Sequence, residues 1–87
     1  MSSTEPKVLM YTTAWCPYCN RARALFQQKG VAYKDIDVEQ VEGARDEMRA
    51  RSGRNTVPQI FVGELHLGGY DDTRALDQKG ELDKLLA

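Results

Sequence analysis

The chain has 87 residues, of which 41% are hydrophobic and 29% charged, a composition typical of a globular domain rather than of a disordered chain. This length has room for one hydrophobic core, so we expect residues 7–87 to form a single domain behind a flexible tail at residues 1–6. The 12 Lys and Arg residues nearly balance the 13 Asp and Glu residues, and a net charge of −1 argues against a nucleic-acid binder, which usually carries a basic excess.

The sequence also argues against a membrane or secreted protein. No apolar run approaches the roughly 18 residues that a membrane-spanning helix needs. The first six residues, MSSTEP, lack the basic start and the apolar stretch of a signal peptide. Cys16 and Cys19 are its two cysteines, far fewer than in a disulfide-stapled secreted domain. We therefore expect a cytoplasmic protein without membrane contact. In the cytoplasm, a lone CxxC pair indicates redox or metal chemistry.

The first third of the chain predicts a strand and then a helix. Residues 7–12 (KVLMYT) are short, apolar and β-prone, as in a buried strand. Pro17 suits the first turn of a helix and Gly30 the residue after its end, so we expect a helix that runs to about residue 29. Its buried face has the i, i+3, i+4 spacing of Ala22, Leu25 and Phe26, and its water-facing residues are Arg21, Arg23, Gln27 and Gln28.

The middle of the chain predicts a second strand and a second helix. Residues 32–38 (AYKDIDV) alternate loosely between polar and apolar, and residues 39–52 have the composition of a helix that ends at Gly53. We expect this helix to bury one face, formed by Val41, Ala44 and Met48. A strand–helix–strand start requires a right-handed crossover, which pairs the first two strands in parallel.

The last third predicts an antiparallel hairpin and a final helix. Residues 59–63 and 64–68 form the two arms of the hairpin. Asp71 or Asp72 then caps a helix that runs to about residue 79. A final turn packs three leucines on the core, namely Leu82, Leu85 and Leu86. The expected order of elements is β-α-β-α-β-β-α.

Cys16-Pro17-Tyr18-Cys19 lies where the first strand hands over to the first helix. At i, i+3 on a helical turn, the two Cα atoms come within about 5–6 Å, a distance that a disulfide spans. Cys16 is at the positive end of the helix dipole, where free backbone N–H groups stabilise a thiolate, whereas Cys19 is one turn inside and stays protonated until it attacks. The pattern predicts thiol–disulfide exchange: Cys16 attacks, Cys19 resolves the mixed disulfide, and a Cys16–Cys19 disulfide forms.

Two other interpretations of the cysteine pair stay open. A CxxC is half of a common zinc site, but zinc takes four ligands and His66 is the one other good candidate, so we expect no metal site. The second alternative is a pair of buried, inert cysteines, although Pro17 and Tyr18 place the pair at the mouth of a helix.

The charge distribution agrees with redox chemistry. Residues 1–34 carry five cations and one carboxylate, whereas residues 35–87 carry seven cations and twelve carboxylates. A basic segment around the cysteines favours a thiolate and an anionic substrate. Solvated helix faces explain Arg21 and Arg23 equally well.

Three motifs together resemble the glutaredoxin family, in its dithiol form of the bacterial glutaredoxin 3 type. Besides the CPYC sequence, Thr56-Val57-Pro58-Gln59 resembles the family's TVP segment, and Gly68-Gly69-Tyr70-Asp71-Asp72 resembles its GG-x-D-D segment. The resemblance covers about residues 7–86, with the motifs in the family's order and spacing. It implies an α/β fold, the minimal thioredoxin fold, with a four-stranded mixed sheet in the strand order 2-1-3-4 and helices on both faces.

The resemblance also implies a glutathione site. Val57, which precedes a cis proline at Pro58, offers its backbone to the cysteinyl part of glutathione, and an anion-friendly helix start holds the γ-glutamyl carboxylate. Asp72 takes the α-ammonium group. The implied glutathione-binding residues are Tyr18, Thr56, Val57, Pro58, Gln59, Gly69, Tyr70, Asp71 and Asp72. Taken one at a time, the same residues also fit turn glycines, a helix cap and a loop that shapes the hairpin.

The chain departs from the family pattern just before Cys16. Many relatives have a lysine there that contacts a glutathione carboxylate, whereas this stretch is Thr12-Thr13-Ala14-Trp15. Candidates to replace the lysine are Arg21, Arg23 and Arg54. Trp15 fits either a substrate platform or a packed aromatic residue. We expect His66 at the surface without a role, and we expect an exposed basic helix face with intrahelical pairs at Arg45, Arg49, Arg51 and Arg54.

The implied function is that of a glutathione-dependent thiol–disulfide oxidoreductase. Such an enzyme reduces protein disulfides and glutathione mixed disulfides, by dithiol and monothiol mechanisms, in redox homeostasis and electron donation. We expect a monomer with no permanently bound cofactor, glutathione as reductant and co-substrate, glutathionylated or disulfide-containing proteins as partners, and glutathione reductase as an indirect partner. Two alternatives stay open: a redoxin that thioredoxin reductase reduces and that supplies ribonucleotide reductase, and a carrier of a [2Fe–2S] cluster held between two chains by Cys16 and glutathione.

Overall fold

The computed structural model describes residues 6–87. Five residues of the predicted tail, 1–5, therefore lie outside the described residues, and Pro6 is exposed. The elements follow in the order β1 (Val8–Thr12), α1 (Pro17–Gln28), β2 (Tyr33–Asp37), α2 (Ala44–Ser52), β3 (Gln59–Val62), β4 (Leu65–Gly68), α3 (Tyr70–Gln78) and α4 (Glu81–Leu86). Within residues 6–87, no helix has the length and apolar character needed to cross a membrane.

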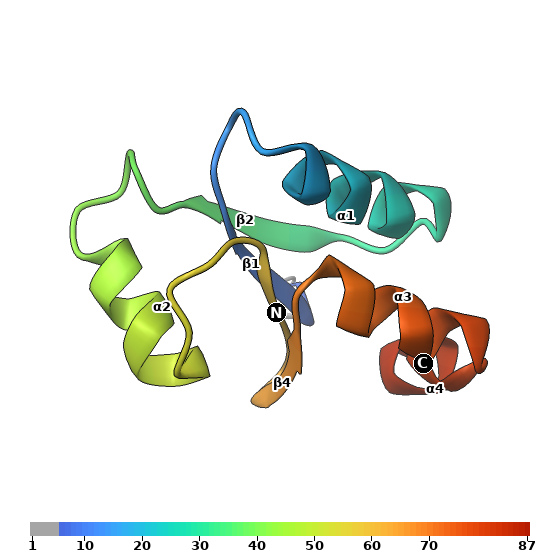
Figure 1. The fold of residues 1–87 in the computed structure, drawn as a ribbon. Coiled ribbons are helices and arrows are strands. Elements are labelled where there is room, and N and C mark those ends of the chain that lie inside the picture. The colour runs from blue at the N-terminus through green and yellow to red at the C-terminus, as the bar shows by residue number, and fades with distance from the viewer. Residues whose placement is uncertain (1–5) are drawn as a thin grey trace, which may run out of the picture.

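The four strands form one mixed sheet in the order β2-β1-β3-β4, which confirms the expected thioredoxin-type sheet. β1 pairs in parallel with β2 and antiparallel with β3, and β4 completes an antiparallel hairpin with β3. α1 makes the crossover between the two parallel strands (Figure 1). β1 is therefore a central strand, and its C-terminal end delivers the chain to the CxxC segment.

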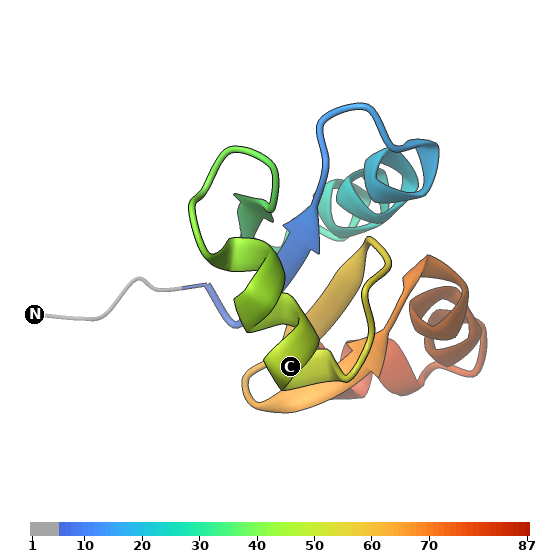
Figure 2. The same ribbon diagram turned by 60° about the vertical axis from the view of Figure 1, so that its left-hand side comes forward.

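Helices cover both faces of the sheet. α1, α3 and α4 lie on one face and α2 covers the other, as the two ribbon views show (Figures 1 and 2). Since successive side chains of a strand point to opposite faces, β1 contributes Val8 and Met10 to one core and Tyr11 to the other. The core under α1 and α4 contains Val8, Met10, Ala22, Phe26, Ile60, Val62 and Leu82. The core under α2 contains Tyr11, Val38, Ala44, Met48 and Phe61.

The second helix is shorter than its composition predicted. It begins at Ala44 instead of residue 39, because Gly43 adopts a left-handed conformation (φ 80°) that an α-helix does not continue through. Before it, the N–H groups of Gln40 and Val41 both donate to the carbonyl oxygen of Asp37, which forms a turn. The prediction that Val41 is buried is therefore wrong: half of its surface is exposed.

The C-terminal elements differ from the prediction in two details. The N-cap of α3 is Gly69 rather than Asp71 or Asp72, and Asp72 instead occupies the third helical position, where its carboxylate accepts the Gly69 N–H. The final turn is a separate helix, α4, since Gly80 takes a φ of 77° between the two helices. Leu82 of α4 is fully buried, as the leucine pattern predicted.

The buried position of Leu82 makes a testable prediction about the C-terminal helix. Leu82→Ala should lower the free energy of unfolding by about 2–5 kcal/mol, because it removes a fully buried side chain and leaves a cavity. Leu65→Ala is the matched control, since Leu65 is 51% exposed and its loss should change the free energy by no more than about 0.5 kcal/mol. Urea unfolding measures both. Equal stability of the two variants would contradict the packing of α4 on the core.

Candidate active site

The two cysteines lie at the start of α1 but differ in accessibility. Cys16 is the N-cap residue, with Pro17 as the first residue of the helix, so it lies at the helix end that carries the positive end of the dipole. Cys16 is 8% exposed, whereas Cys19 is fully buried one turn inside. Both are free thiols. Cys16 is therefore the more accessible of the two thiols.

Cys19 has an environment that keeps its proton in place. Burial raises the pKa of Cys19 to about 11, and its contact with the Cys16 thiol adds to this rise. The backbone N–H of Thr13 and the positive charge of Arg23 act in the opposite direction without reversing it. The thiol of Cys19 is therefore protonated at neutral pH, in agreement with the expectation that this thiol keeps its proton.

Arg23 forms the centre of a polar network behind the cysteines. Its Nε lies 2.6 Å from the Asp35 carboxylate of β2, and its guanidinium also donates to the Thr12 hydroxyl (2.9 Å) and to the Thr13 carbonyl (3.2 Å). The prediction that Arg23 faces water is therefore wrong, because its side chain is only 19% exposed. Arg23 turns away from solvent because it pairs with the Asp35 carboxylate of β2. The Arg23 guanidinium thus makes its hydrogen bonds within the protein.

The segment before β3 faces Cys16 from the other side. The Val57–Pro58 peptide bond is cis, as the resemblance implied. The Val57 carbonyl oxygen lies 4.0 Å from the Cys16 Sγ. This approach follows from strand pairing: Tyr11 of β1 is opposite Gln59 of β3, so the residues after β1 and those before β3 meet at the same edge of the sheet.

The start of α3 closes the site beside this segment. Gly68 has a φ of 110°, and a Cβ at this position would lie 2.3 Å from Asp72 Oδ2, so glycine is required both by the backbone and by the close carboxylate. The Gly69 N–H donates to Asp72 Oδ2 at 3.0 Å. This hydrogen bond lowers the pKa of Asp72, and the Arg54 guanidinium contributes in the same direction. Asp72 is therefore an anion at neutral pH.

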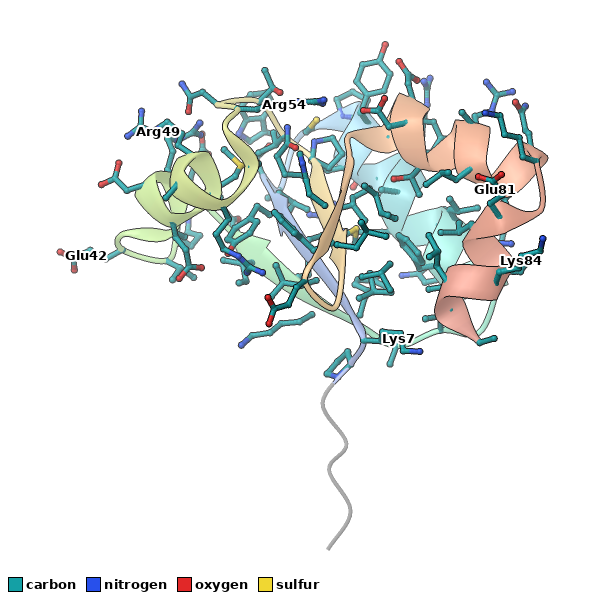
Figure 3. The ribbon with its side chains drawn as sticks, turned by 90° about the horizontal axis from the view of Figure 1, so that it is seen from below. Lys7, Glu42, Arg49, Arg54, Glu81 and Lys84 are labelled. Carbon is teal, nitrogen blue, oxygen red and sulfur yellow. The ribbon has the colours of Figure 1, made fainter. Side chains whose placement is uncertain are left out.

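These segments line a cavity of about 190 Å³ that is open to solvent. It is lined by Tyr18, Arg54, Thr56, Val57, Pro58, Gln59, Gly69, Tyr70, Asp71 and Asp72. All nine residues that the sequence suggested for glutathione thus surround one cavity, and Arg54 joins them. Figure 3 shows Arg54 on the segment that leaves α2, on the side of the molecule where α3 begins. Its guanidinium lies 3.3 Å from the Asp72 carboxylate.

The other two candidate cations lie elsewhere. Arg21 lies over the ring of Tyr18, with its guanidinium carbon 5.1 Å from the ring centroid. Arg23 belongs to the network behind the cysteines. Among the three, Arg54 is the cation that lines the cavity.

The basic run on α2 divides between different contacts. Arg49 pairs with Asp46 within the helix, as the sequence predicted. Arg51 instead lies over the Phe61 ring (4.5 Å) and donates to the Tyr11 hydroxyl. The run therefore contributes to packing as well as to surface charge.

Two contacts near the site were not evident from the sequence. Trp15 is 71% exposed, and its indole N–H donates to the Glu39 carboxylate at 3.1 Å. His66, which we expected at the surface without a role, is half-buried and lies 2.7 Å from the amide oxygen of Gln59. The hairpin pairs His66 with Phe61, but the contact of its ring with Gln59 is a tertiary contact that has no signal in the sequence. Among residues 6–87, no three His, Cys, Asp or Glu side chains gather as potential metal ligands.

Comparisons with known proteins identify the family of this chain. A family model described as glutaredoxin matches residues 8–67. The chain belongs to the glutaredoxin family. It is 50% identical over 82 residues to the glutaredoxin of Pseudomonas aeruginosa, and the aligned region covers 94% of this chain and 98% of the relative. It is 51% identical over 79 residues to glutaredoxin 3 of Escherichia coli, covering 91% of this chain and 95% of the relative.

Solved structures show the same fold as this glutaredoxin. The solution structure of glutaredoxin from Brucella melitensis matches with a TM-score of 0.79 and 48% identity, over 99% of this chain and 94% of that one. A crystal structure of the buckwheat glutaredoxin–glutathione complex matches with a TM-score of 0.86 and 28% identity, over 93% of this chain and 76% of that one. Family and fold together support glutathione-dependent thiol oxidoreductase chemistry in general.

The environment of Cys19 makes a prediction about its titration. In a Cys16→Ser variant, the rate of Cys19 alkylation should reach half its maximum above pH 9.0, the ordinary value, because burial remains the main cause of the raised pKa. Mass spectrometry of iodoacetamide-treated samples measures this profile. The same variant unfolded in urea is the control and should titrate at the ordinary value. If the alkylation rate of Cys19 had the same pH dependence in the folded and the unfolded protein, the raised pKa of Cys19 would be contradicted.

Proposed function

We propose that this glutaredoxin reduces glutathione mixed disulfides and protein disulfides, with glutathione as the electron donor. The observation that carries this proposal is the position of the Cys16 thiol, at a helix N-terminus and 4.0 Å from the Val57 carbonyl. Val57 lines the cavity that contains all nine residues implied for glutathione. A thiol group held at the edge of this cavity is placed to exchange with the sulfur of a bound glutathionyl group.

With a glutathionylated protein, the reaction needs only Cys16. The Cys16 thiolate attacks the glutathione sulfur of the mixed disulfide, a new Cys16–glutathione disulfide forms, and the protein leaves as a thiolate that takes a proton. The thiolate of a second glutathione then attacks the bound glutathione sulfur. Oxidised glutathione leaves, made of the substrate's glutathionyl group and one free glutathione, and the Cys16 thiolate is regenerated. One free glutathione is consumed for each protein thiol released.

With a protein disulfide, both cysteines take part. Cys16 attacks one sulfur and forms a mixed disulfide with the protein, whose other sulfur leaves as a thiol. Cys19 then loses its proton and attacks the Cys16 sulfur, which forms the Cys16–Cys19 disulfide and releases the second protein thiol. Two glutathione molecules reduce this disulfide in turn. The raised pKa of Cys19 makes its deprotonation a requirement of this route alone.

We propose that glutathione lies in the cavity with its cysteinyl backbone paired to Val57, as one further rung of a sheet. Its γ-glutamyl end then lies at the start of α3, where the Asp72 carboxylate takes the α-ammonium group. Arg54, the cation within the cavity, supplies a positive charge to a glutathione carboxylate in place of the family's lysine. The Arg54–Asp72 ion pair must then open to receive the zwitterionic substrate.

The proposal extends to partners and compartment. Residues 7–87 act as one domain and as a monomer, without a permanent cofactor. Glutathionylated or disulfide-containing proteins are the substrates, and glutathione reductase maintains the glutathione pool that reduces the enzyme. We place the activity in the cytoplasm, where such a pool keeps thiols reduced.

Two alternatives use the same cysteines differently. A redoxin reduced by thioredoxin reductase would not require the Gly69–Asp72 side of the cavity, whereas Gly69, Asp71 and Asp72 all line the cavity here. A [2Fe–2S] carrier joined through Cys16 is disfavoured by Pro17 at the first helical position, because the ring stiffens the segment that must open around a cluster. Charge-transfer bands after anaerobic purification would support the carrier.

Single cysteine variants test the assignment of roles. Cys19→Ser should retain turnover of a glutathionylated peptide, because that reaction needs one thiol, and should lose reduction of a protein disulfide that requires resolution. Cys16→Ser should lose both activities. An assay coupled to glutathione reductase and NADPH oxidation measures each rate. Substantial turnover by the Cys16→Ser protein would overturn the mechanism.

The proposed contact of Asp72 with the substrate ammonium gives a second prediction. Asp72→Asn should raise KM for a glutathionylated peptide by about ten- to a hundredfold, as expected for loss of a hydrogen bond to a charged group. Asp77→Asn on the same helix removes the same charge outside the cavity and serves as the control. Equal KM values for the two variants would contradict the placement of the γ-glutamyl end.

A further inference from the structure

The side chain of Gln59 is buried, yet all of its polar atoms have partners. It is 1% exposed, and its Nε2 donates to the Thr56 carbonyl (2.9 Å) and lies 3.2 Å from the Thr56 hydroxyl. Its Oε1 lies 2.7 Å from His66 Nε2. Because an amide oxygen can only accept, the His66 Nε2 must carry a proton and donate it. The ring nitrogen that bears the proton in neutral His66 is therefore Nε2.

The position of the His66 ring is fixed by the β3–β4 hairpin. His66 is paired with Phe61, and a register shift in the hairpin follows between Phe61 and Ile60. The two rings lie 4.8 Å apart at 32°, so the imidazole stacks on a buried aromatic. Gln59 and Phe61 are two residues apart on β3 and therefore share a face of the sheet. The imidazole thus stacks on Phe61 and donates a hydrogen bond to Gln59.

We propose that His66 is a positioning residue for the glutathione site, acting through Gln59 on the main chain at Thr56. The Gln59 amide holds both oxygens of Thr56, and the next residue, Val57, offers the backbone that pairs with the substrate under the proposed function. Without the His66 donor, the Gln59 amide oxygen is a buried acceptor without a partner, which is energetically costly. A rotation of the amide that gives this oxygen a new partner then becomes favourable, and it breaks the contacts with Thr56. The Thr56–Val57 backbone then loses its support.

The charges around His66 favour its neutral form. Burial is the main cause that lowers the pKa of His66, and the Arg54 guanidinium acts in the same direction, while the Asp72 carboxylate opposes both. Gln59 and Phe61, which contact the ring, carry no charge, and the cavity that His66 helps to line also has one carboxylate and one cation, Glu81 and Lys84. At neutral pH the ring therefore donates from Nε2 as a neutral group.

A simpler role for His66 is packing against Phe61, and the two roles are separable. His66→Phe keeps an aromatic ring over Phe61 but removes the donor. It should raise KM for a glutathionylated peptide by about three- to tenfold with kcat changed less than twofold, since a buried acceptor loses its partner while the thiols are untouched. Leu65→Ala on the same strand is the control and should keep the wild-type KM. An unchanged KM in His66→Phe would overturn the inference.

A double-mutant comparison tests whether His66 acts through Gln59. Gln59→Leu removes the acceptor together with the Thr56 contacts, so it should raise KM by itself. Adding His66→Phe to Gln59→Leu should then raise KM no further, because the donor has no acceptor left to hold. Independent effects that multiply would overturn the inference.

The wild-type protein provides a test that does not depend on the variants folding. The ¹⁵N chemical shifts of the His66 ring at neutral pH should show a proton on Nε2, and a proton on Nδ1 alone would overturn the inference. The inference rests on the proposed function, but the two fail differently. A wild-type protein inactive toward glutathionylated peptide refutes the proposed function, whereas an active wild type with an equally active His66→Phe variant refutes only the role of His66.

Discussion

The antiparallel register of β1 and β3 is the constraint on which the site depends. It sets Tyr11 opposite Gln59, so the chain that leaves β1 and the chain that enters β3 meet at one edge of the sheet. One segment brings the Cys16 thiol and the other brings the Val57 carbonyl, 4.0 Å away. The hairpin then returns the chain through β4, and α3 starts beside Pro58, where a Cβ on Gly69 would lie 3.5 Å from the Pro58 carbonyl. A slip of one residue in this register would turn every side chain of β3 to the opposite face and separate the two halves of the site.

Buried polar contacts hold each half of the site in place. Behind the cysteines, Arg23 joins Asp35 to the Thr12 and Thr13 segment, and the Thr13 N–H faces the Cys19 thiol. Below the cavity, the Gln59 amide holds Thr56. Each of these groups would be costly to bury without its partner, so the network favours one arrangement of the backbone around the thiols. A small domain can therefore present an ordered site, and under the proposed function the bound glutathione supplies the remaining wall of the cavity.

The parts that the sequence predicted correctly depend on local signals. Pro17 and the apolar spacing of Ala22 and Phe26 define α1, and the apolar runs and turn glycines define the strands. The motifs further identified every residue that now lines the cavity except Arg54, which was proposed only as a substitute cation. The predictions that were wrong concern residues whose position depends on tertiary contacts or on an unusual backbone conformation. Arg23 has the helical position of a surface residue, but Asp35 on a neighbouring strand draws it inward. Gly43 adopts a left-handed conformation, so α2 begins later than predicted, and His66 contacts Phe61 and Gln59 of the neighbouring strand instead of lying at the surface.

The central claim is that glutathione, bound beside Cys16, supplies the electrons. The most direct measurement is the rate at which the purified protein reduces a disulfide substrate with two alternative electron sources, glutathione with glutathione reductase or thioredoxin reductase alone, each followed by NADPH oxidation. The account predicts rapid turnover with glutathione and little with thioredoxin reductase. Turnover that is rapid with thioredoxin reductase and absent with glutathione would contradict it, because the cavity beside Cys16 would then have no part in the reaction.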